Sequence, residues 1–196
     1  RGASVKVVSV VGSRFTVEGV RFTVPTPGRH DALNALAALA ACRAAGVRLA
    51  EMAAPLATFA GVARRFQSLG TAGGVEVIDD FAHNPDKFRA ALATARARLQ
   101  DPQGRVLAIF QPHGFGPTRF LWNDLVETFT EALRPTDILW LPEIYYAGGT
   151  VVADVSSAQL AADIARHDRD ARFLPNRKDL PAAVTVEARA GDLVIV

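Results

Sequence analysis

The 196-residue sequence has little of what marks secreted, membrane or nucleic-acid-binding proteins. Its one cysteine, Cys42, cannot form an internal disulfide, and it lies in an Ala-rich helical pattern where we expect a small buried side chain in a reducing compartment. The longest apolar run, residues 35–42, is too short to cross a bilayer, and we expect no signal segment. The formal net charge is only +2, and the arginines are scattered. The sequence therefore predicts a cytoplasmic globular protein with neither nucleic acid nor membrane as a partner.

Apolar residues, in contrast, make up 49% of the chain, which is enough to build a core. Residues 1–24 alternate apolar and polar side chains between Gly-containing turns, a pattern that predicts a meander of strands. The Pro-Thr-Pro-Gly segment at 25–28 ends the meander, because proline cannot donate to a strand ladder. Helices are predicted over 31–45 and 49–58.

From residue 64 onward, short apolar strands alternate with helices. Strands are predicted at 75–78, 105–110, 138–141, 172–174 and 192–196. Helices are predicted from the Asn84 cap to about 99, over 118–133, from the Ser156 cap to about 166, and after an Asp179 cap. This order predicts an α/β fold with a Rossmann-like, mostly parallel sheet covered by helices on both faces. Ligands of such sheets bind outside the carboxyl ends of the strands.

Two predicted strand-end loops concentrate polar side chains. The acidic loop is residues 79–85 (DDFAHNP), and the His113 loop is residues 111–119 (QPHGFGPTR). If their strands are neighbours, Asp80, His83 and His113 come within reach of one ligand, and Arg64-Arg65 can turn toward the same edge. Either loop alone fits helix capping or an ordinary loop histidine. Together they favour a site for phosphate or nucleotide chemistry, since arginines and helix N-termini bind anions.

Several segments, in this order along the chain, are similar to motifs of the Mur ligase family, the ATP-dependent amide-forming ligases of peptidoglycan synthesis. Residues 28–38 (GRHDALNALAA) resemble G-x-H-N-x-x-N-A-x-A-A, and residues 59–66 resemble F-x-G-x-x-R-R-F. The acidic loop resembles D-D-Y-A-H-H-P, and residues 110–113 match F-Q-P-H. Residues 147–149 (AGG) approximate the A-G-E of the alanine-adding members.

The resemblance implies that residues 1–58 are the partial end of the central ATPase domain and that residues 59–196 are the C-terminal Mur ligase domain. It implies a ligase that joins an amino acid, L-alanine in the alanine-adding members, to UDP-N-acetylmuramate through an acyl phosphate. The cofactors would be ATP and Mg²⁺, held mainly by parts of the enzyme absent from this chain, which has no Gly-rich phosphate-binding loop. The partners would be the UDP-muramyl nucleotide sugar, the amino acid and the remainder of the ligase chain. The isolated chain is expected to be inactive.

Residue roles follow from the same resemblance, and no residue is predicted to bind a metal. The implied roles are ATP binding by His30, Asn34, Arg65 and Asp80, amino-acid binding by Phe81, His83 and Arg119, and catalysis by His83 and His113. For His30 and Asn34, the alternative role is capping of the helix that starts there. For the Arg64-Arg65 pair, the alternative is a solvated pair at a domain hinge.

The chain also departs from the family pattern. The alanine-adding members read H-R-Y-x-R-T where this chain has Gly114 and Pro117, so the arginines that clamp the amino-acid carboxylate are missing. Phe81 replaces a tyrosine and Asp31 an asparagine. A related ligase that adds a different amino acid or a peptide, and a catalytically dead nucleotide-binding homologue, therefore stay open. A phosphoacceptor receiver module is a third alternative, but it needs a lysine after a later strand, and residues 105–111 and 138–142 supply none.

Overall fold

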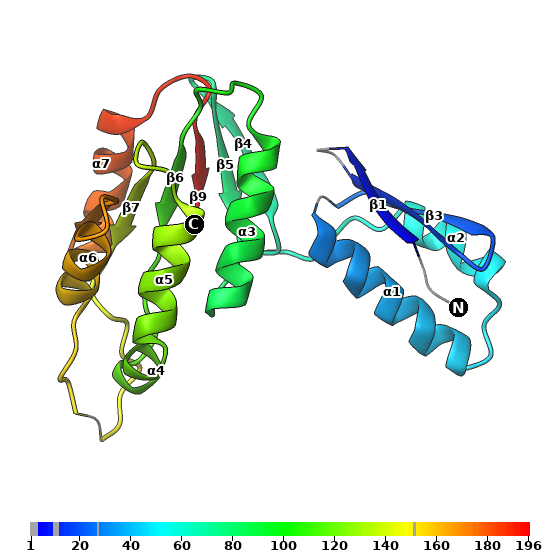
Figure 1. Ribbon diagram of the computed structural model, residues 1–196, viewed down its shortest axis with the longest axis horizontal. Helices are drawn as coiled ribbons and strands as arrows, with labels where there is room; N and C mark the ends of the chain where they lie inside the picture. The colour runs from blue at the N-terminus through cyan, green and yellow to red at the C-terminus, as the bar shows by residue number, and fades with distance from the viewer. Residues whose placement is uncertain (1–3, 10–11, 27, 151) are drawn as a thin grey trace. The chain divides into compact units, whose positions relative to one another are not determined.

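The computed structural model describes residues 4–9, 12–26, 28–150 and 152–196. The chain folds as two compact units, Arg1–Arg65 and Phe66–Val196 (Figure 1). The sequence placed the domain boundary after Thr58, and the division between the units lies after Arg65. Each unit has its own core of buried apolar side chains. No helix in the described part of the chain is long and apolar enough to span a membrane.

The first unit is an antiparallel three-stranded sheet with two helices packed on it. Its elements are β1 (Ser4–Ser9), β2 (Gly12–Val17), β3 (Val20–Val24), α1 (Arg29–Ala44) and α2 (Leu49–Ala57). Phe15 and Phe22 are register partners on β2 and β3, and their stacked rings, 5.7 Å apart, pack with Leu39 and Met52 of the helices. The predicted meander and both predicted helices are confirmed. Cys42 is exposed, contrary to the prediction, because the buried positions of α1 end at Leu39.

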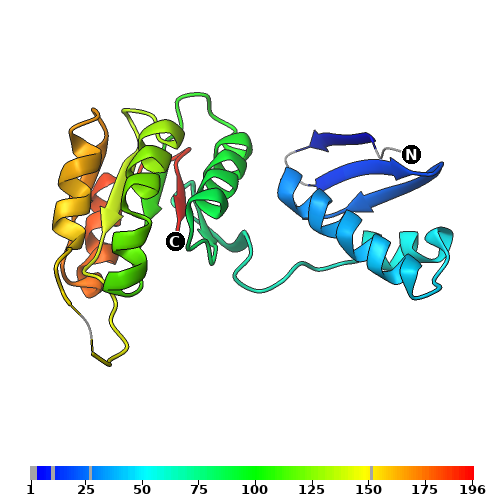
Figure 2. The same ribbon diagram turned by 60° about the horizontal axis from the view of Figure 1, so that its bottom comes forward.

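The second unit is built on a six-stranded sheet in the order β4-β5-β9-β6-β7-β8 (Figures 1 and 2). Its strands are β4 (Gln67–Ala72), β5 (Val75–Asp79), β6 (Val106–Ile109), β7 (Ile138–Leu141), β8 (Asp170–Phe173) and β9 (Leu193–Ile195). Only β4 is antiparallel to its neighbour, so the mostly parallel sheet is confirmed. The apolar runs at β6, β7 and β9 are buried in the middle of this sheet, as parallel strands covered on both faces require.

Helices cover both faces of this sheet. They are α3 (Pro85–Arg98), α4 (Phe115–Phe120), α5 (Trp122–Ala132), α6 (Ser157–Ala165), the 3₁₀ turn η1 (Arg177–Asp179) and α7 (Leu180–Glu187). Helices α3, α5 and α6 pack on one face through a core that includes Leu92, Phe129 and Ile164. Helix α7 packs against Trp140 and neighbouring strand residues on the other face. The Rossmann-like arrangement expected from the sequence is confirmed.

Three local predictions were incomplete or wrong. Strand β4 was not predicted, because all six of its residues are exposed and show no apolar alternation. The helix predicted over 118–133 is two helices that meet at Leu121, and the first begins earlier, just after Gly114. The Asp179 side chain makes no capping hydrogen bond. Instead, Asn176 accepts from the backbone N–H of Lys178 and starts η1 one turn earlier.

Candidate active site

The acidic loop and the His113 loop follow strands β5 and β6, but these two strands are not neighbours. The C-terminal strand β9 lies between them and pairs in parallel with both. The condition that the two strands are neighbours, on which the predicted site depended, is therefore not met. Sequence patterns could not show this, because β9 comes from the far end of the chain. The carboxyl ends of β5 and β6 still open onto one edge, since all three strands run the same way. Asp80 and His113 thus lie at the same edge of the sheet.

Asp80 joins the start of the second unit to the sheet. Its carboxylate accepts a 2.8 Å hydrogen bond from the backbone N–H of Phe66, and its own N–H donates to the carbonyl of Val196 at 2.8 Å. Phe66 is buried and has a left-handed backbone, with φ of 46°. The pocket beside Asp80 has a volume of about 30 Å³, room for little more than one water molecule. This pocket is therefore too small to hold a nucleotide.

His83 is held in one orientation at the exposed carboxyl edge of the sheet, where the acidic loop and the His113 loop lie; this edge is called the rim below. Its Nδ1 lies 3.0 Å from the carbonyl oxygen of Phe81, and its Nε2 lies 3.2 Å from Nζ of Lys87. A carbonyl only accepts and an ammonium only donates, so both contacts are satisfied by the neutral tautomer with its proton on Nδ1. The Phe81 ring packs 5.2 Å from the imidazole. The Nε2 lone pair is thereby aimed at a cation on the first turn of α3.

His113 is fixed by the loop that follows β7. The N–H of Gly114 donates to the carbonyl of Tyr145 at 2.8 Å, and the N–H of Tyr145 donates to the carbonyl of Pro112 at 2.8 Å. The His113 and Tyr145 rings meet edge to face with centroids 5.5 Å apart. The side-chain amide of Gln111 adds a hydrogen bond to the carbonyl of Glu143 at 2.9 Å. The loops after β6 and β7 therefore form one locally ordered surface around His113.

Arg119 is already engaged within the domain. Its Nε donates to Asp154 Oδ1 at 2.9 Å, and its Nη2 donates to the same carboxylate and to the carbonyl of Val152, the latter at 3.1 Å. Gly114, where the family motif has an arginine, has φ of 78° and ψ of 140°, a conformation almost restricted to glycine. A Cβ there would also lie 3.3 Å from Cδ of Pro117. The backbone of this loop is thus incompatible with the missing arginine.

The remaining predicted ATP-binding residues lie in the first unit. His30 and Asn34 are four residues apart in α1 and so lie on one face of that helix, with Asn34 exposed and His30 half-buried. The N-cap of α1 is Gly28, without a side-chain capping hydrogen bond, so neither residue caps the helix. His30 Nε2 lies 3.6 Å from Asp31 Oδ1. Arg65 is exposed beside the division between the units.

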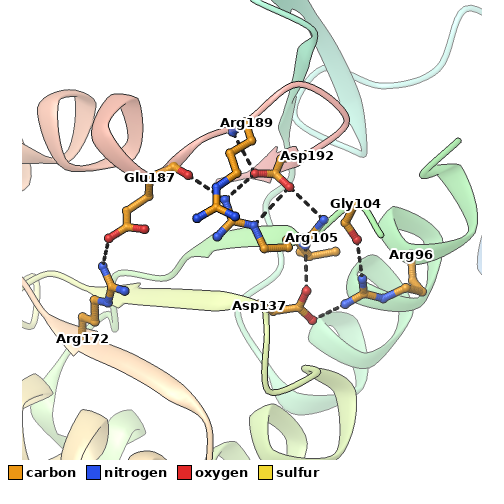
Figure 3. Close-up of polar contacts among 9 residues, drawn as sticks. Arg96, Gly104, Arg105, Asp137, Arg172, Glu187, Arg189 and Asp192 are labelled. Atoms are coloured by element: carbon orange, nitrogen blue, oxygen red, sulfur yellow. Dashed lines mark hydrogen bonds and ion pairs between the residues drawn. The ribbon is translucent and has the colours of Figure 1, made fainter. Parts of the chain in front are cut away.

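The opposite, amino-terminal edge of the sheet carries a network of ion pairs (Figure 3). Arg105 donates to both oxygens of Asp192, and Arg96 pairs with the fully buried carboxylate of Asp137. Burial raises the pKa of Asp192, but hydrogen bonds from Arg105 and Arg189 outweigh it and leave that pKa below its usual value. Asp137 also accepts from the backbone N–H of Val106, at the start of β6, and from that of Arg134, in the loop after α5. This edge stabilises the sheet and leaves the carboxyl edge for ligands.

The comparison with known families agrees with this geometry. The model for "Mur ligase, glutamate ligase domain" matches residues 64–196, which include both loops and the whole second sheet. The chain belongs to the Mur ligase family. The family suggested by the sequence motifs is thereby confirmed.

Relatives extend the match over the first unit. The chain is 42% identical over 175 residues to the UDP-N-acetylmuramate–L-alanine ligase of Sorangium cellulosum, covering 89% of this chain and 36% of the relative. It is 40% identical over 185 residues to the ligase of the same name from Cereibacter sphaeroides, covering 94% of this chain and 37% of that protein. The chain thus spans little more than a third of these relatives.

Solved structures confirm the fold. The UDP-N-acetylmuramate–alanine ligase of Thermotoga maritima matches with a TM-score of 0.74 at 24% identity, covering 95% of this chain and 39% of that one. A MurF structure from Acinetobacter baumannii matches with a TM-score of 0.70 at 18% identity, covering 98% of this chain and 40% of that one. At these identities, the matches establish a Mur ligase architecture and leave residue roles to the chemistry of the rim.

Sequence reasoning did not identify two residues that contact the predicted site histidines, Lys87 beside His83 and Tyr145 beside His113. The i, i+4 spacing of His83 and Lys87 at a helix start was a signal for the first, because such side chains meet. Nothing in the sequence pairs Tyr145 with His113, since that contact joins two loops through the sheet order. In the described residues, no group of three or more His, Cys, Asp or Glu side chains is placed to hold a metal.

Proposed function

We propose that this chain is the C-terminal part of an ATP-dependent, ADP-forming ligase that joins an amino acid to UDP-N-acetylmuramate in peptidoglycan precursor synthesis. L-Alanine is the first candidate for the amino acid. The observation that carries the proposal is 40–42% identity to two ligases named for this reaction, over 89% and 94% of the chain. Because the chain covers only about 36% of the first of these ligases, the activity belongs to a longer protein that includes it. The cytoplasmic location expected from composition stays a prediction.

The residues of both units fit the groups that such a ligase binds. On the exposed face of α1, the Asn34 amide can donate to and accept from an adenine edge, with His30 one turn away. Arg65 and Asp80 are assigned to the phosphates and ribose, as a cation and a carboxylate near the start of the second unit. Mg²⁺ typically uses one or two protein carboxylates together with substrate phosphates. In this chain no residue is predicted to bind the metal, and Mg²⁺ would be held mainly by parts of the longer protein.

In the proposed reaction, bound ATP supplies the phosphoryl group that activates the lactate carboxylate. The amine would add to the acyl phosphate, and inorganic phosphate would leave as the tetrahedral intermediate collapses to the amide. The protein has to hold the two groups together and to neutralise charge on that intermediate. His83 can accept a proton from the attacking amine at Nε2, because its Nδ1 proton is already used by the Phe81 carbonyl. His113 is assigned to the reacting carbonyl. Its backbone is fixed by the two hydrogen bonds between Tyr145 and the His113 loop.

A ligase that adds a different amino acid or a peptide is the second candidate. Two observations favour it: the backbone at Gly114 cannot carry an arginine without strain, and Arg119 is occupied by Asp154. The usual anchor for the alanine carboxylate is therefore missing or rearranged. A catalytically dead homologue would bind nucleotide without turnover.

One assay separates these candidates. ADP release is measured by enzyme coupling with the full-length protein that contains this chain, UDP-N-acetylmuramate, and each amino acid in turn. Release that depends on both the sugar nucleotide and L-alanine supports the first candidate, and release with another amino acid or a peptide supports the second. Nucleotide binding without release under any condition indicates a dead homologue. The isolated 196-residue chain should release no ADP, and turnover by it would contradict the proposed division of the site.

A further inference from the structure

We propose that Lys87 binds the carboxylate of the acceptor amino acid and so selects an acceptor with a free α-carboxylate. The inference rests on the proposed ligase function, and it adds a specificity-determining residue to the acidic loop side of the rim. It is carried by three observations: the position of Lys87 in its helix, the absence of a carboxylate partner, and the engagement of Arg119.

Lys87 occupies a helix position that is unfavourable for a cation. Asn84 caps α3 and its Oδ1 accepts from the Lys87 backbone N–H at 3.0 Å, so Lys87 is the third residue of the helix. The N-terminus of a helix carries partial positive charge and favours acidic side chains there. A lysine at this point lowers the stability of the helix. Residues that break a local rule in this way are expected at functional sites.

The Lys87 ammonium has no carboxylate partner among the residues that the structure describes. Its side-chain contact is the neutral Nε2 of His83, at 3.2 Å. The adjacent acid, Asp86, lies 3.4 Å from Arg89 instead. Many other cations of the second unit, by contrast, are matched to carboxylates, as the pairs at the amino-terminal edge show. Lys87 thus presents an uncompensated positive charge beside the proposed catalytic histidine.

The pair formed by Lys87 and His83 is complementary to a zwitterionic amino acid. The ammonium of Lys87 can donate to the acceptor carboxylate, and Nε2 of His83 can accept from the acceptor amine. A bound amino acid would replace the direct contact between the two side chains with one hydrogen bond to each. This arrangement places the amine at the lone pair that is proposed to take its proton.

Arg119, the other cation considered for this role, is committed elsewhere. Its guanidinium donates to Asp154 through Nε and Nη2 and to the Val152 carbonyl. These contacts use Nε and Nη2, so a bidentate grip on a substrate carboxylate through that side of the guanidinium would require Arg119 to give up Asp154 and the Val152 carbonyl. Lys87 gives up only a neutral acceptor, which makes it the better anchor.

The test measures steady-state kinetics of the full-length protein carrying Lys87→Gln, with the amino acid that the wild type uses best. Loss of a charge-assisted hydrogen bond should raise KM for that amino acid roughly 10- to 100-fold, with KM for ATP within about twofold of wild type. If L-alanine is that acceptor, the preference for L-alanine over L-alaninamide should fall by a similar factor. Lys87→Arg, which keeps the charge, should restore most of the affinity.

Lys178→Gln is the matched control, because Lys178 is an exposed lysine in η1, which follows β8, and three strands separate β8 from β5 in the sheet order. It should leave both KM values unchanged. A folded Lys87→Gln protein with an unchanged KM for the amino acid overturns the inference, as does an equal rise in KM for ATP and the amino acid. Absence of amino-acid-dependent ADP release by the wild type overturns the proposed function itself, and this inference with it.

Discussion

Replacing Asp192 with asparagine should destabilise the second unit strongly, although Asp192 is far from the proposed site. The Asp192 side chain is 4% exposed and that of Arg105 is 12% exposed. Asp192 accepts from the Arg105 backbone at 2.9 Å, from its guanidinium at 2.7 and 3.2 Å, and from the Arg189 backbone at 2.9 Å. The asparagine side chain has the same shape, but its NH₂ group would face N–H donors of Arg105 or Arg189 that now bind a carboxylate oxygen. The Arg105 guanidinium would also lose its counter-charge. Breaking a buried pair of this kind costs about 3–5 kcal/mol.

Urea unfolding followed by tryptophan fluorescence measures this cost, because both tryptophans, Trp122 and Trp140, lie in the second unit. Glu127→Gln is the control: its carboxylate is 61% exposed and 3.5 Å from Arg89, so its loss should cost less than about 1 kcal/mol. A loss below about 1 kcal/mol for Asp192→Asn, with an unchanged slope of the transition, would refute the view that the amino-terminal edge holds the sheet together.

Three further predictions concern pH, helix capping and the helix start at Lys87. Hydrogen bonds from Arg98 lower the pKa of Glu76 below its unfolded value of 4.5, and the pKa of Asp192 is likewise below its unfolded value of 3.8. Both carboxylates therefore stabilise the folded state at pH values above these unfolded pKa values. That stability is lost as the pH falls through the pKa values of the folded state. The urea concentration at the midpoint of unfolding should therefore decrease when the pH is lowered below about 4. This decrease should be smaller in Asp192→Asn. Asn84→Ala removes the cap of α3 and should cost about 1 kcal/mol in the same urea assay, whereas Asn84→Asp should cost almost nothing. Lys87→Gln should raise stability by about 0.3–1 kcal/mol, measured by urea unfolding, and a loss of stability would show that Lys87 supports the fold instead.

Much of the second unit was predictable, because its central strands are apolar runs of the length that buried parallel strands need. β6, β7 and β9 were each located within a residue or two. The start of α3 was also predictable, since Asn84 followed by Pro85 is a local signal that the structure confirms through the hydrogen bond to Lys87. Local chemistry decides these features, so one sequence is sufficient to find them.

Strand β4 and the order of the sheet were not predictable in the same way. β4 is an exposed edge strand whose place is set by pairing with β5 and by the Gly73-Gly74 turn, where both glycines have positive φ. Two adjacent glycines before an apolar strand were a signal for this hairpin. The insertion of β9 between β5 and β6 depends on pairings between residues far apart in the chain, such as Glu76 with Leu193 and Val106 with Leu193, and no periodicity records them. The loops after β5 and β6 lie at one edge, as predicted, because parallel strands share an edge whatever their order.

The two edges of the sheet differ in how completely their charges are matched, and this difference supports the location of the site. At the amino-terminal edge, Arg105 and Asp192 are paired and buried, so their charges serve the stability of the domain. At the carboxyl edge, Lys87 faces a neutral imidazole at the unfavourable end of a helix, and His83 is exposed. An exposed charge at this position is available to a ligand of opposite charge. An anionic or zwitterionic substrate at this rim would be such a ligand, and the ligase chemistry proposed for this chain requires such a substrate there.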